Sequence, residues 1–75
     1  MKANQAKAGM TIIAHNVPTV GGKIGDVTVQ VSHDVRYGAF QSWDDASCYI
    51  HGERSDGLSW PVWLYDLADV TVVSS

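Results

Sequence analysis

One cysteine and three histidines are the residues of this 75-residue chain most able to bind a metal ion or attack a substrate. Cys48 precedes His51 by three residues, whereas His15 and His33 lie in two other segments. Structural zinc sites need four ligands in recognisable close pairs, and this chain offers only one such pair. In a regular strand, Cys48 and His51 would also point to opposite faces. We therefore expect no metal site and no cofactor.

Nucleophilic and acid–base catalysis also lack a complete set of residues. Cys48 lies among apolar neighbours, which favours a buried, inert thiol over an activated nucleophile. The glycine-rich segment 21–25 lacks the spacing and the Lys-Ser/Thr ending of a phosphate-binding loop. Four aspartates could act in acid–base catalysis or bind a cation: Asp44, Asp45, Asp66 and Asp69. A role in turns explains them more simply, because an Asp side chain forms hydrogen bonds with the nearby backbone of a turn. We expect a protein that is not an enzyme.

Large aromatic side chains are the stronger candidates for a functional site. The chain contains three Trp, three Tyr and one Phe. One interpretation is that most of these rings fill the core of a small domain. The other is an exposed patch that binds a partner, since exposed aromatic patches usually mark interaction surfaces. The predicted members of that patch are Tyr37, Trp43, Tyr49, Trp63 and Tyr65.

Alternation predicts which rings face solvent, because successive side chains of a strand point to opposite faces of the sheet. In the segment before the last turn, the residues expected in the core are Trp60, Val62 and Leu64. Trp63 and Tyr65 would then face outward. By the same rule, inward Cys48 and Ile50 would turn Tyr49 outward. The predicted patch therefore depends on where the strands lie.

Strand signals recur along the chain. The clearest is 27–32, in which three valines alternate with polar residues, as in a strand with one face in the core. Four further strands are expected between Gly-, Pro- and Asp-rich turns: 10–14, 46–51, 58–64 and 70–73. Residues 65–69 are too few for an α-helix and should form a short 3₁₀ turn before the last strand. Residues 16–26 are expected to form a long loop, a common location of function.

Five short strands without a covering helix predict an all-β domain that curls into a small barrel. At this length the chain has room for one core, so residues 1–75 should form a single domain. The barrel is expected over 10–73. Residues 1–9 are polar and Ala-rich, and we expect a loose N-terminal arm or a single turn there.

Composition restricts the partners and the compartment. Eight acidic and five basic residues give a net charge of −3, and the basic residues are scattered, which disfavours nucleic-acid binding. A single cysteine excludes an internal disulfide and fits a reducing cytosol. No apolar run approaches the roughly 20 residues of a membrane span, and residues 1–6 lack the apolar core of a signal peptide. We expect a cytoplasmic protein that does not contact a membrane.

The order of these features resembles the SH3-like small barrels. Such barrels open with a Gly-led strand and a long first loop, as in the segment that begins Ala8-Gly9-Met10-Thr11-Ile12. Two strands joined by a tight hairpin resemble 48–64, and the usual strand, 3₁₀ turn and final strand resemble 62–73. The opening, residues 1–10, is similar to the openings of small bacteriophage proteins. The resemblance implies a five-stranded SH3-like barrel that is phage-encoded and works in the host cytoplasm.

We therefore expect a non-enzymatic binding module. Its partner would be a host or phage protein, which contacts the exposed aromatics and the 16–26 loop. Two alternatives stay open at this point. One is a nucleic-acid-binding small barrel, since such barrels present aromatic rings to bases. The other is a structural role in which the rings seal the contact of a homo-oligomer.

Overall fold

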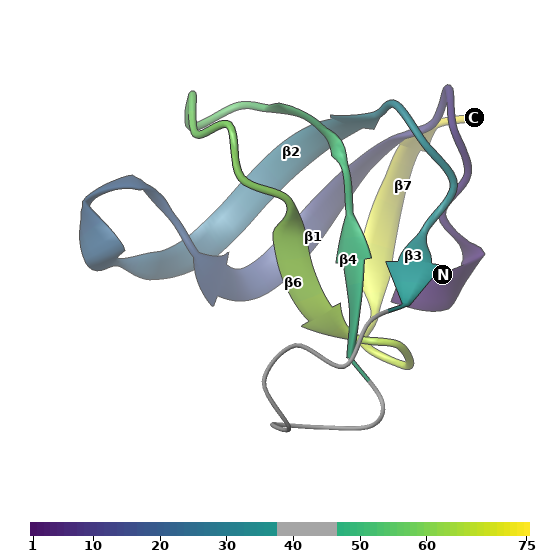
Figure 1. The fold of residues 1–75 in the computed structure, drawn as a ribbon, viewed down its shortest axis with the longest axis horizontal. Coiled ribbons are helices and arrows are strands. Elements are labelled where there is room, and N and C mark those ends of the chain that lie inside the picture. The colour runs from purple at the N-terminus through teal and green to yellow at the C-terminus, as the bar shows by residue number, and fades with distance from the viewer. Residues whose placement is uncertain (38–46) are drawn as a thin grey trace.

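The computed structural model describes residues 1–37 and 47–75, which form two antiparallel sheets (Figure 1). The four-stranded sheet has the order β5 (Gly52–Arg54), β2 (Ile24–Val31), β1 (Thr11–Pro18) and β7 (Val70–Ser74). The three-stranded sheet has the order β3 (Arg36–Tyr37), β4 (Ser47–Ile50) and β6 (Val62–Tyr65). Two short 3₁₀ turns complete the elements of the described chain: η1 (Ala3–Gln5) and η2 (Val20–Gly22). An all-β fold is thereby confirmed for these residues.

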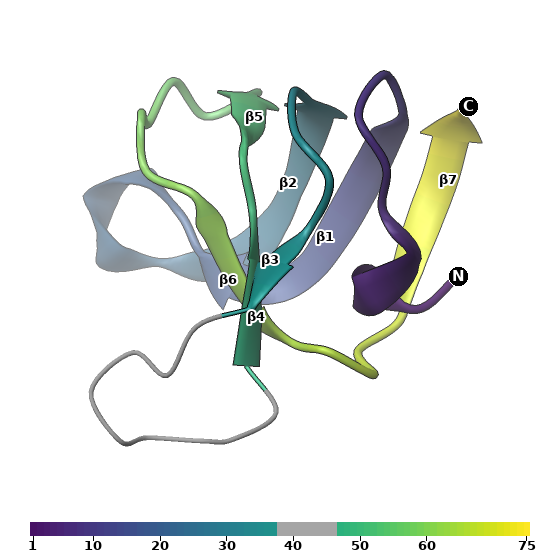
Figure 2. The ribbon, with the colours of Figure 1, turned by 45° about the vertical axis from the view of Figure 1, so that its right-hand side comes forward.

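Strands β4 and β5 carry the chain from one sheet into the other. Only His51 separates them, so the seven assigned strands amount to six in space (Figure 2). Gly52 makes the crossing, and it lies opposite Val31 of β2. A Cβ at this position would collide with the backbone carbonyl of Gln30. Glycine is therefore required where β5 approaches β2.

The expected five-stranded closed barrel is wrong in two respects. The described strands number more than five, and no ladder among them joins the outer strands of the two sheets. Six strand paths and a sharp crossing at Gly52 let two sheets cover each other's apolar faces without closure. The result is a small open β-structure with a core between its sheets.

The core confirms the alternation of the valines. Val27, Val29 and Val31 of β2 are all buried, and the largest other fully buried side chains are Ile12, Val17, Cys48, Ile50 and Val62. These side chains belong to one buried cluster, and the removal of their apolar surface from water is the main favourable term in folding.

A bulge in β1 changes the expected extent of the first loop. Ala14 pairs with Val27 and Val17 pairs with Gly25, so one extra residue sits on β1. Asn16 has a φ of 56°, a value Asn tolerates better than most residues. The bulge returns the strand to register, and β1 continues to Pro18. The expected loop at 16–26 is therefore wrong, because only residues 19–23 lie between β1 and β2.

The N-terminal segment is packed and not loose. Ala3 and Ala6 are fully buried, although their small side chains carried no pattern that predicts it. The Ala3 N–H donates to the Ala68 carbonyl (2.8 Å), and the Val70 N–H donates to the Met1 carbonyl (2.8 Å). The expected loose arm is therefore wrong. The alternative expectation, a single turn, agrees with η1.

The connection before the last strand is a two-residue turn at 66–67 in place of the expected 3₁₀ turn. The Ala68 N–H donates to the Tyr65 carbonyl (3.0 Å), which closes the turn. This hydrogen bond joins residues i and i+3, as in a 3₁₀ helix. It is not followed by a second bond of the same kind, so the segment is a turn and not a 3₁₀ helix.

Candidate interaction surface

The outward side of the three-stranded sheet carries two of the predicted rings in contact. Tyr49 of β4 lies directly opposite Trp63 of β6. Their ring centroids are 4.8 Å apart and the rings are tilted by 43°. Cys48 and Ile50 are fully buried on the other side of β4, which confirms the expected alternation. Cross-strand aromatic pairs of this kind also stabilise the sheet, by about 0.5–1.5 kcal/mol beyond their buried area.

Three of the five predicted site residues lie on the outward side of the three-stranded sheet: Tyr49, Trp63 and Tyr65. Tyr65 is two residues beyond Trp63 on β6, so it points to the same side, and it is 60% exposed. Tyr37 is placed by its backbone, which pairs with Cys48. Trp43 lies outside the described residues.

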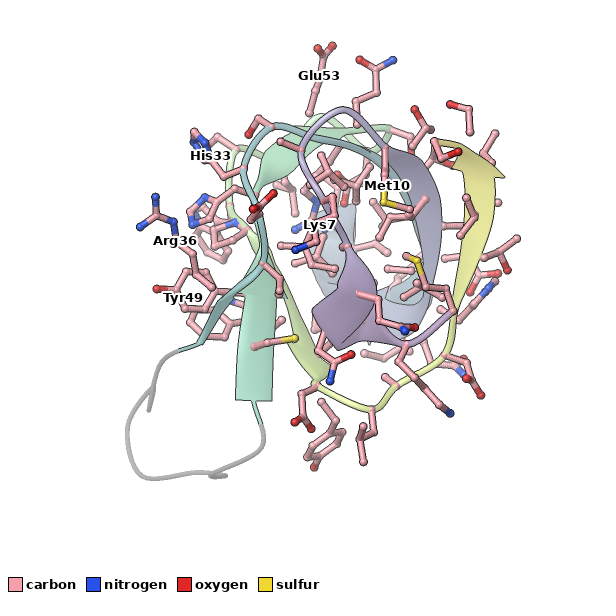
Figure 3. The ribbon with its side chains drawn as sticks, turned by 90° about the vertical axis from the view of Figure 1, so that its right-hand side faces the viewer. Lys7, Met10, His33, Arg36, Tyr49 and Glu53 are labelled. Atoms are coloured by element: carbon pink, nitrogen blue, oxygen red, sulfur yellow. The ribbon has the colours of Figure 1, made fainter. Side chains whose placement is uncertain are left out.

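Basic side chains border these rings. Arg36 of β3 lies opposite Tyr49, and the His51 ring meets the Tyr49 ring edge-on at 5.2 Å. The His33 ring lies 5.7 Å from His51 at 66°. Figure 3 shows His33, Arg36 and Tyr49 on one side of the molecule. We call this surface the aromatic face, defined by His33, Arg36, Tyr49, His51, Trp63 and Tyr65.

The pKa of His51 reports the electrostatics of the aromatic face. Partial burial lowers it below the ordinary value of 6.5, and the positive charges of His33 and Arg36 lower it further. Each of these effects disfavours the protonated imidazole. At neutral pH His51 is therefore mostly uncharged, while Arg36 keeps a full positive charge.

A pocket of about 310 Å³ adjoins the aromatic face. Its first wall is the β1–β2 connection and its second is the segment that leads into β6. The lining residues are Pro18, Thr19, Val20, Gly21, Gly22, Arg54, Leu58, Trp60, Pro61, Val62 and Trp63. Trp63 belongs both to the pocket and to the aromatic face, so the two form one continuous surface. Apolar pockets with a few polar groups are the usual shape of a binding site.

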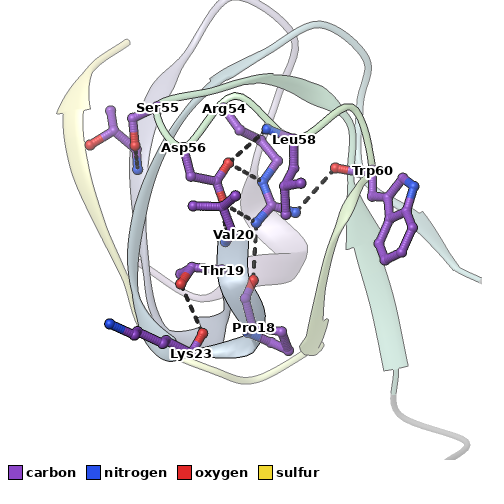
Figure 4. Close-up of polar contacts among 10 residues, drawn as sticks. Pro18, Thr19, Val20, Lys23, Arg54, Ser55, Asp56, Leu58 and Trp60 are labelled. Carbon is purple, nitrogen blue, oxygen red and sulfur yellow. Dashed lines mark hydrogen bonds and ion pairs between the residues drawn. The ribbon is translucent and has the colours of Figure 1, made fainter.

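Arg54 ties the two walls of the pocket together (Figure 4). Its Nη2 donates to the Pro18 carbonyl (3.0 Å) on one wall, and its Nη1 donates to the Trp60 carbonyl (3.2 Å) on the other. The guanidinium also makes a two-point contact with the Asp56 carboxylate, at 3.0 Å and 2.7 Å. The Arg54 side chain is only 4% exposed, so this contact is shielded from water. Bidentate Arg–carboxylate pairs are among the stronger polar interactions.

Asp56 is held as an anion by its surroundings. Desolvation raises its pKa, but the Arg54 hydrogen bond, the N–H groups of Leu58 and Val20 and the Arg54 charge together bring the pKa below its ordinary value. Those two N–H groups lie at 3.2 Å from its oxygens. The same carboxylate therefore orders both walls of the pocket.

Trp60 is the site residue that the sequence reasoning placed wrongly. It was expected in the core, and it is 70% exposed at the rim of the pocket. Pro61 has no N–H to give to a ladder, and β6 begins only at Val62, so alternation does not extend back to Trp60. The Trp-Pro pair was the signal that could have revealed this. Val20, Leu58 and Arg54 also belong to the pocket, and the segment 16–26 indicated only the first.

A second polar arrangement lies on the four-stranded sheet. The His15 ring contacts Asp26 through Nδ1 (3.2 Å) and the Thr71 hydroxyl through Nε2 (2.8 Å). This is the connectivity of an acyl-transfer triad. Acyl transfer also needs donors for a developing oxyanion and a bound substrate. The three side chains lie on an open strand surface and line neither described pocket, so we interpret them as a cross-strand polar contact.

The Cys48 thiol lies in surroundings that keep it protonated. Burial, and secondarily the charge of Asp66, raise the pKa of Cys48 to about 11, so its thiol stays protonated and unreactive at neutral pH. Within residues 1–37 and 47–75, no three His, Cys, Asp or Glu side chains gather as metal ligands. The same residues form no helix long and apolar enough to cross a membrane.

Comparison with known proteins gives no match to a family model, a curated protein or a solved structure. A function for this chain is therefore inferred from its geometry. That geometry places one continuous surface, the aromatic face with its pocket, at the junction of segments that are far apart in the sequence.

Proposed function

We propose that this chain is a protein-binding module and that it contacts its partner through the aromatic face and the adjoining pocket. The observation that carries the proposal is the position of Trp63, which lines the pocket and contacts Tyr49 on the aromatic face. Buried aromatic anchors and the pockets beside them supply most of the affinity of protein interfaces.

The exposure of large apolar side chains supports this proposal. Val20 is 53% exposed and Trp60 is 70% exposed, and both line the same pocket. Single exposed apolar residues need no explanation, but a contiguous group indicates an interaction surface. Tyr65 extends the group along β6.

The internal support of the pocket also favours binding. Arg54 fixes both walls through backbone carbonyls, and it is itself fixed by Asp56. A site whose walls are already ordered loses less conformational entropy when a ligand binds. This is the arrangement expected of a recognition surface that is formed before the partner arrives.

The order of the strands supports an SH3-like arrangement as part of the same proposal. Treating β4 and β5 as one bent strand gives the path β7–β1–β2–β5/β4–β6, in which the last strand lies beside the first. A solved structure with this strand path would agree with it, and a different pairing of β7 would contradict it.

The binding proposal is tested by recovery of partners on the immobilised chain. Trp60→Ala and Trp63→Ala should each lower the recovery of specifically bound protein, because they remove the rim and the shared wall of the pocket. Val73→Ala is the matched control, since Val73 is 57% exposed on β7 of the other sheet. Thermal unfolding of each variant separates lost binding from lost structure. Equal recovery with all three variants would contradict the proposed surface.

A further inference from the structure

Charge is distributed unevenly over this acidic chain. Its formal net charge is −3. The ion pairs of the described residues are Lys2–Asp69, His15–Asp26 and Arg54–Asp56. None of them involves the aromatic face, whose charged and titratable members are Arg36, His33, His51 and the tyrosines. Among the described residues, the basic groups of the aromatic face therefore form no ion pair, although the chain as a whole is acidic.

The geometry of these basic groups places them around one ring. Arg36 lies across from Tyr49 in the β3–β4 ladder, and His51 contacts the edge of the same ring at 5.2 Å. His33 follows His51 at 5.7 Å. The side chains of Arg36, His51 and His33 therefore border the ring of Tyr49, which itself contacts Trp63. Figure 3 shows His33 and Arg36 on the same side of the molecule as Tyr49.

Repulsion among these basic groups indicates that a ligand bound between them would carry a negative charge. The described titratable and charged groups that face His51 are His33 before β3, Arg36 on β3 and Tyr49 on β4. His33 and Arg36 both disfavour a charge on His51. An anion placed between them would relieve this repulsion and would gain charge-assisted hydrogen bonds.

We propose that the aromatic face binds an extended acidic segment of the partner protein, with carboxylates over Arg36 and the two histidines and an apolar side chain against Tyr49 and Trp63. This inference rests on the proposed binding function and specifies the chemistry of the partner. Arg36 suits a carboxylate because its planar guanidinium can bind both oxygens at once. The rings supply the apolar contact that a purely electrostatic encounter lacks.

Charge favours an acidic protein segment over a nucleic acid. A nucleic-acid strand carries a phosphate about every 3.4 Å, and its affinity depends on several cations that neutralise them. The aromatic face has one permanent cation, Arg36, and the net charge of −3 repels a long polyanion. Carboxylates in a protein segment can instead be few and can be placed only where the basic groups lie.

A random-sequence peptide library, selected on the immobilised full chain, tests this inference without a known partner. Peptides that also bind Trp63→Ala are removed, so the survivors depend on the proposed surface. The affinity of the most enriched peptide is then measured by fluorescence anisotropy for wild type, Arg36→Gln and Lys7→Gln. Lys7 is the matched control, because it is an exposed cation on the N-terminal segment, apart from Arg36 and Tyr49 (Figure 3).

The expected survivors are net negative and carry an apolar residue. Arg36→Gln should weaken their binding about tenfold, the loss of one charge-assisted hydrogen bond, whereas Lys7→Gln should leave it unchanged. Binding should tighten from pH 7.5 to pH 5.5, because the pH then approaches the lowered pKa of His51 and its imidazole gains a proton. His51→Ala should weaken this pH dependence.

Each contrary result identifies which proposal fails. Neutral or basic survivors that need Trp63 would overturn the acidic partner and leave the binding module intact. A library without Trp63-dependent survivors would overturn the binding proposal itself. Tighter binding of single-stranded oligothymidylate than of any peptide would replace the acidic segment with a nucleic acid. A dimer in light scattering that Trp63→Ala dissolves would identify a second copy as the occupant.

Discussion

The buried thiol of Cys48 predicts an alkaline loss of stability that can be calculated from the structure. Cys48 is fully buried beneath the aromatic face, and its pKa rises from 9.0 to about 11. The unfolded chain releases the thiol proton near pH 9, whereas the folded chain keeps it until about pH 11. The unfolded state therefore binds fewer protons in this window, and the free energy of unfolding falls as the pH rises.

The size of this loss follows from the two pKa values. One pH unit of difference is worth about 1.36 kcal/mol, so the full effect is about 2.7 kcal/mol above pH 11. At pH 10 the loss is about 1.4 kcal/mol. For a domain of this size the midpoint of thermal unfolding should then fall by about 6–11 °C relative to pH 8.

The assay is thermal unfolding of wild type and Cys48→Ala between pH 8 and pH 10.5, followed by circular dichroism. The variant leaves a small cavity, which lowers its stability by the same amount at every pH. All other ionisable groups are present in both proteins, so the difference between the two curves isolates the thiol. Curves that fall in parallel would show that the Cys48 pKa is not raised, and would refute the burial of β4 on which the aromatic face depends.

Three substitutions test other parts of the fold. Gly52→Ala should destabilise the chain by about 3 kcal/mol or more, because the added Cβ meets backbone and not a flexible side chain; chemical denaturation measures this. Arg54→Met should cost about 3 kcal/mol, since it removes hydrogen bonds to two carbonyls of the pocket walls; wild-type stability in this variant would contradict the tie between the walls. Lys2→Ala should leave the unfolding midpoint within error, because its pair with Asp69 is exposed; a large shift would contradict that interpretation.

Alternation predicted the parts of the fold where strands are regular. The valines of 27–32 line the core, and Tyr49 lies on the outward side of β4 because its two neighbours are buried. A period of two is a local property, so it can be read from adjacent residues. The pairing of Tyr49 with Trp63 is different, because register depends on how distant strands meet.

Local interruptions of the strands limited the rest of the prediction. Pro61 ends the alternation of β6, and Trp60 therefore lies at the rim of the pocket and not in the core. The bulge at Asn16 restores the register of β1, which turned an expected eleven-residue loop at 16–26 into a five-residue one at 19–23. Each interruption shifts the alternation by one residue. A prediction that assumes strict alternation therefore assigns the residues beyond the interruption to the wrong face of the sheet.

The pocket could not be predicted because its support is a long-range contact. Arg54 and Asp56 are two residues apart in an ordinary turn sequence. Their importance comes from Pro18, which is 36 residues away and accepts a hydrogen bond from Arg54. Small buried residues were missed for a related reason, since Ala3 and Ala6 carry little apolar surface and yet are fully covered by later segments.

The position of β1 between β2 and β7 has a consequence for synthesis. β1 is synthesised well before its neighbour β7, and the hydrogen bonds between Met1 and Val70 also cannot form until Val70 has been made. Folding can therefore finish only after residues 70–74 have emerged, and until then the apolar side of β1 is open to chaperones and proteases. A nascent chain that stops before Val70 should be degraded and should not accumulate.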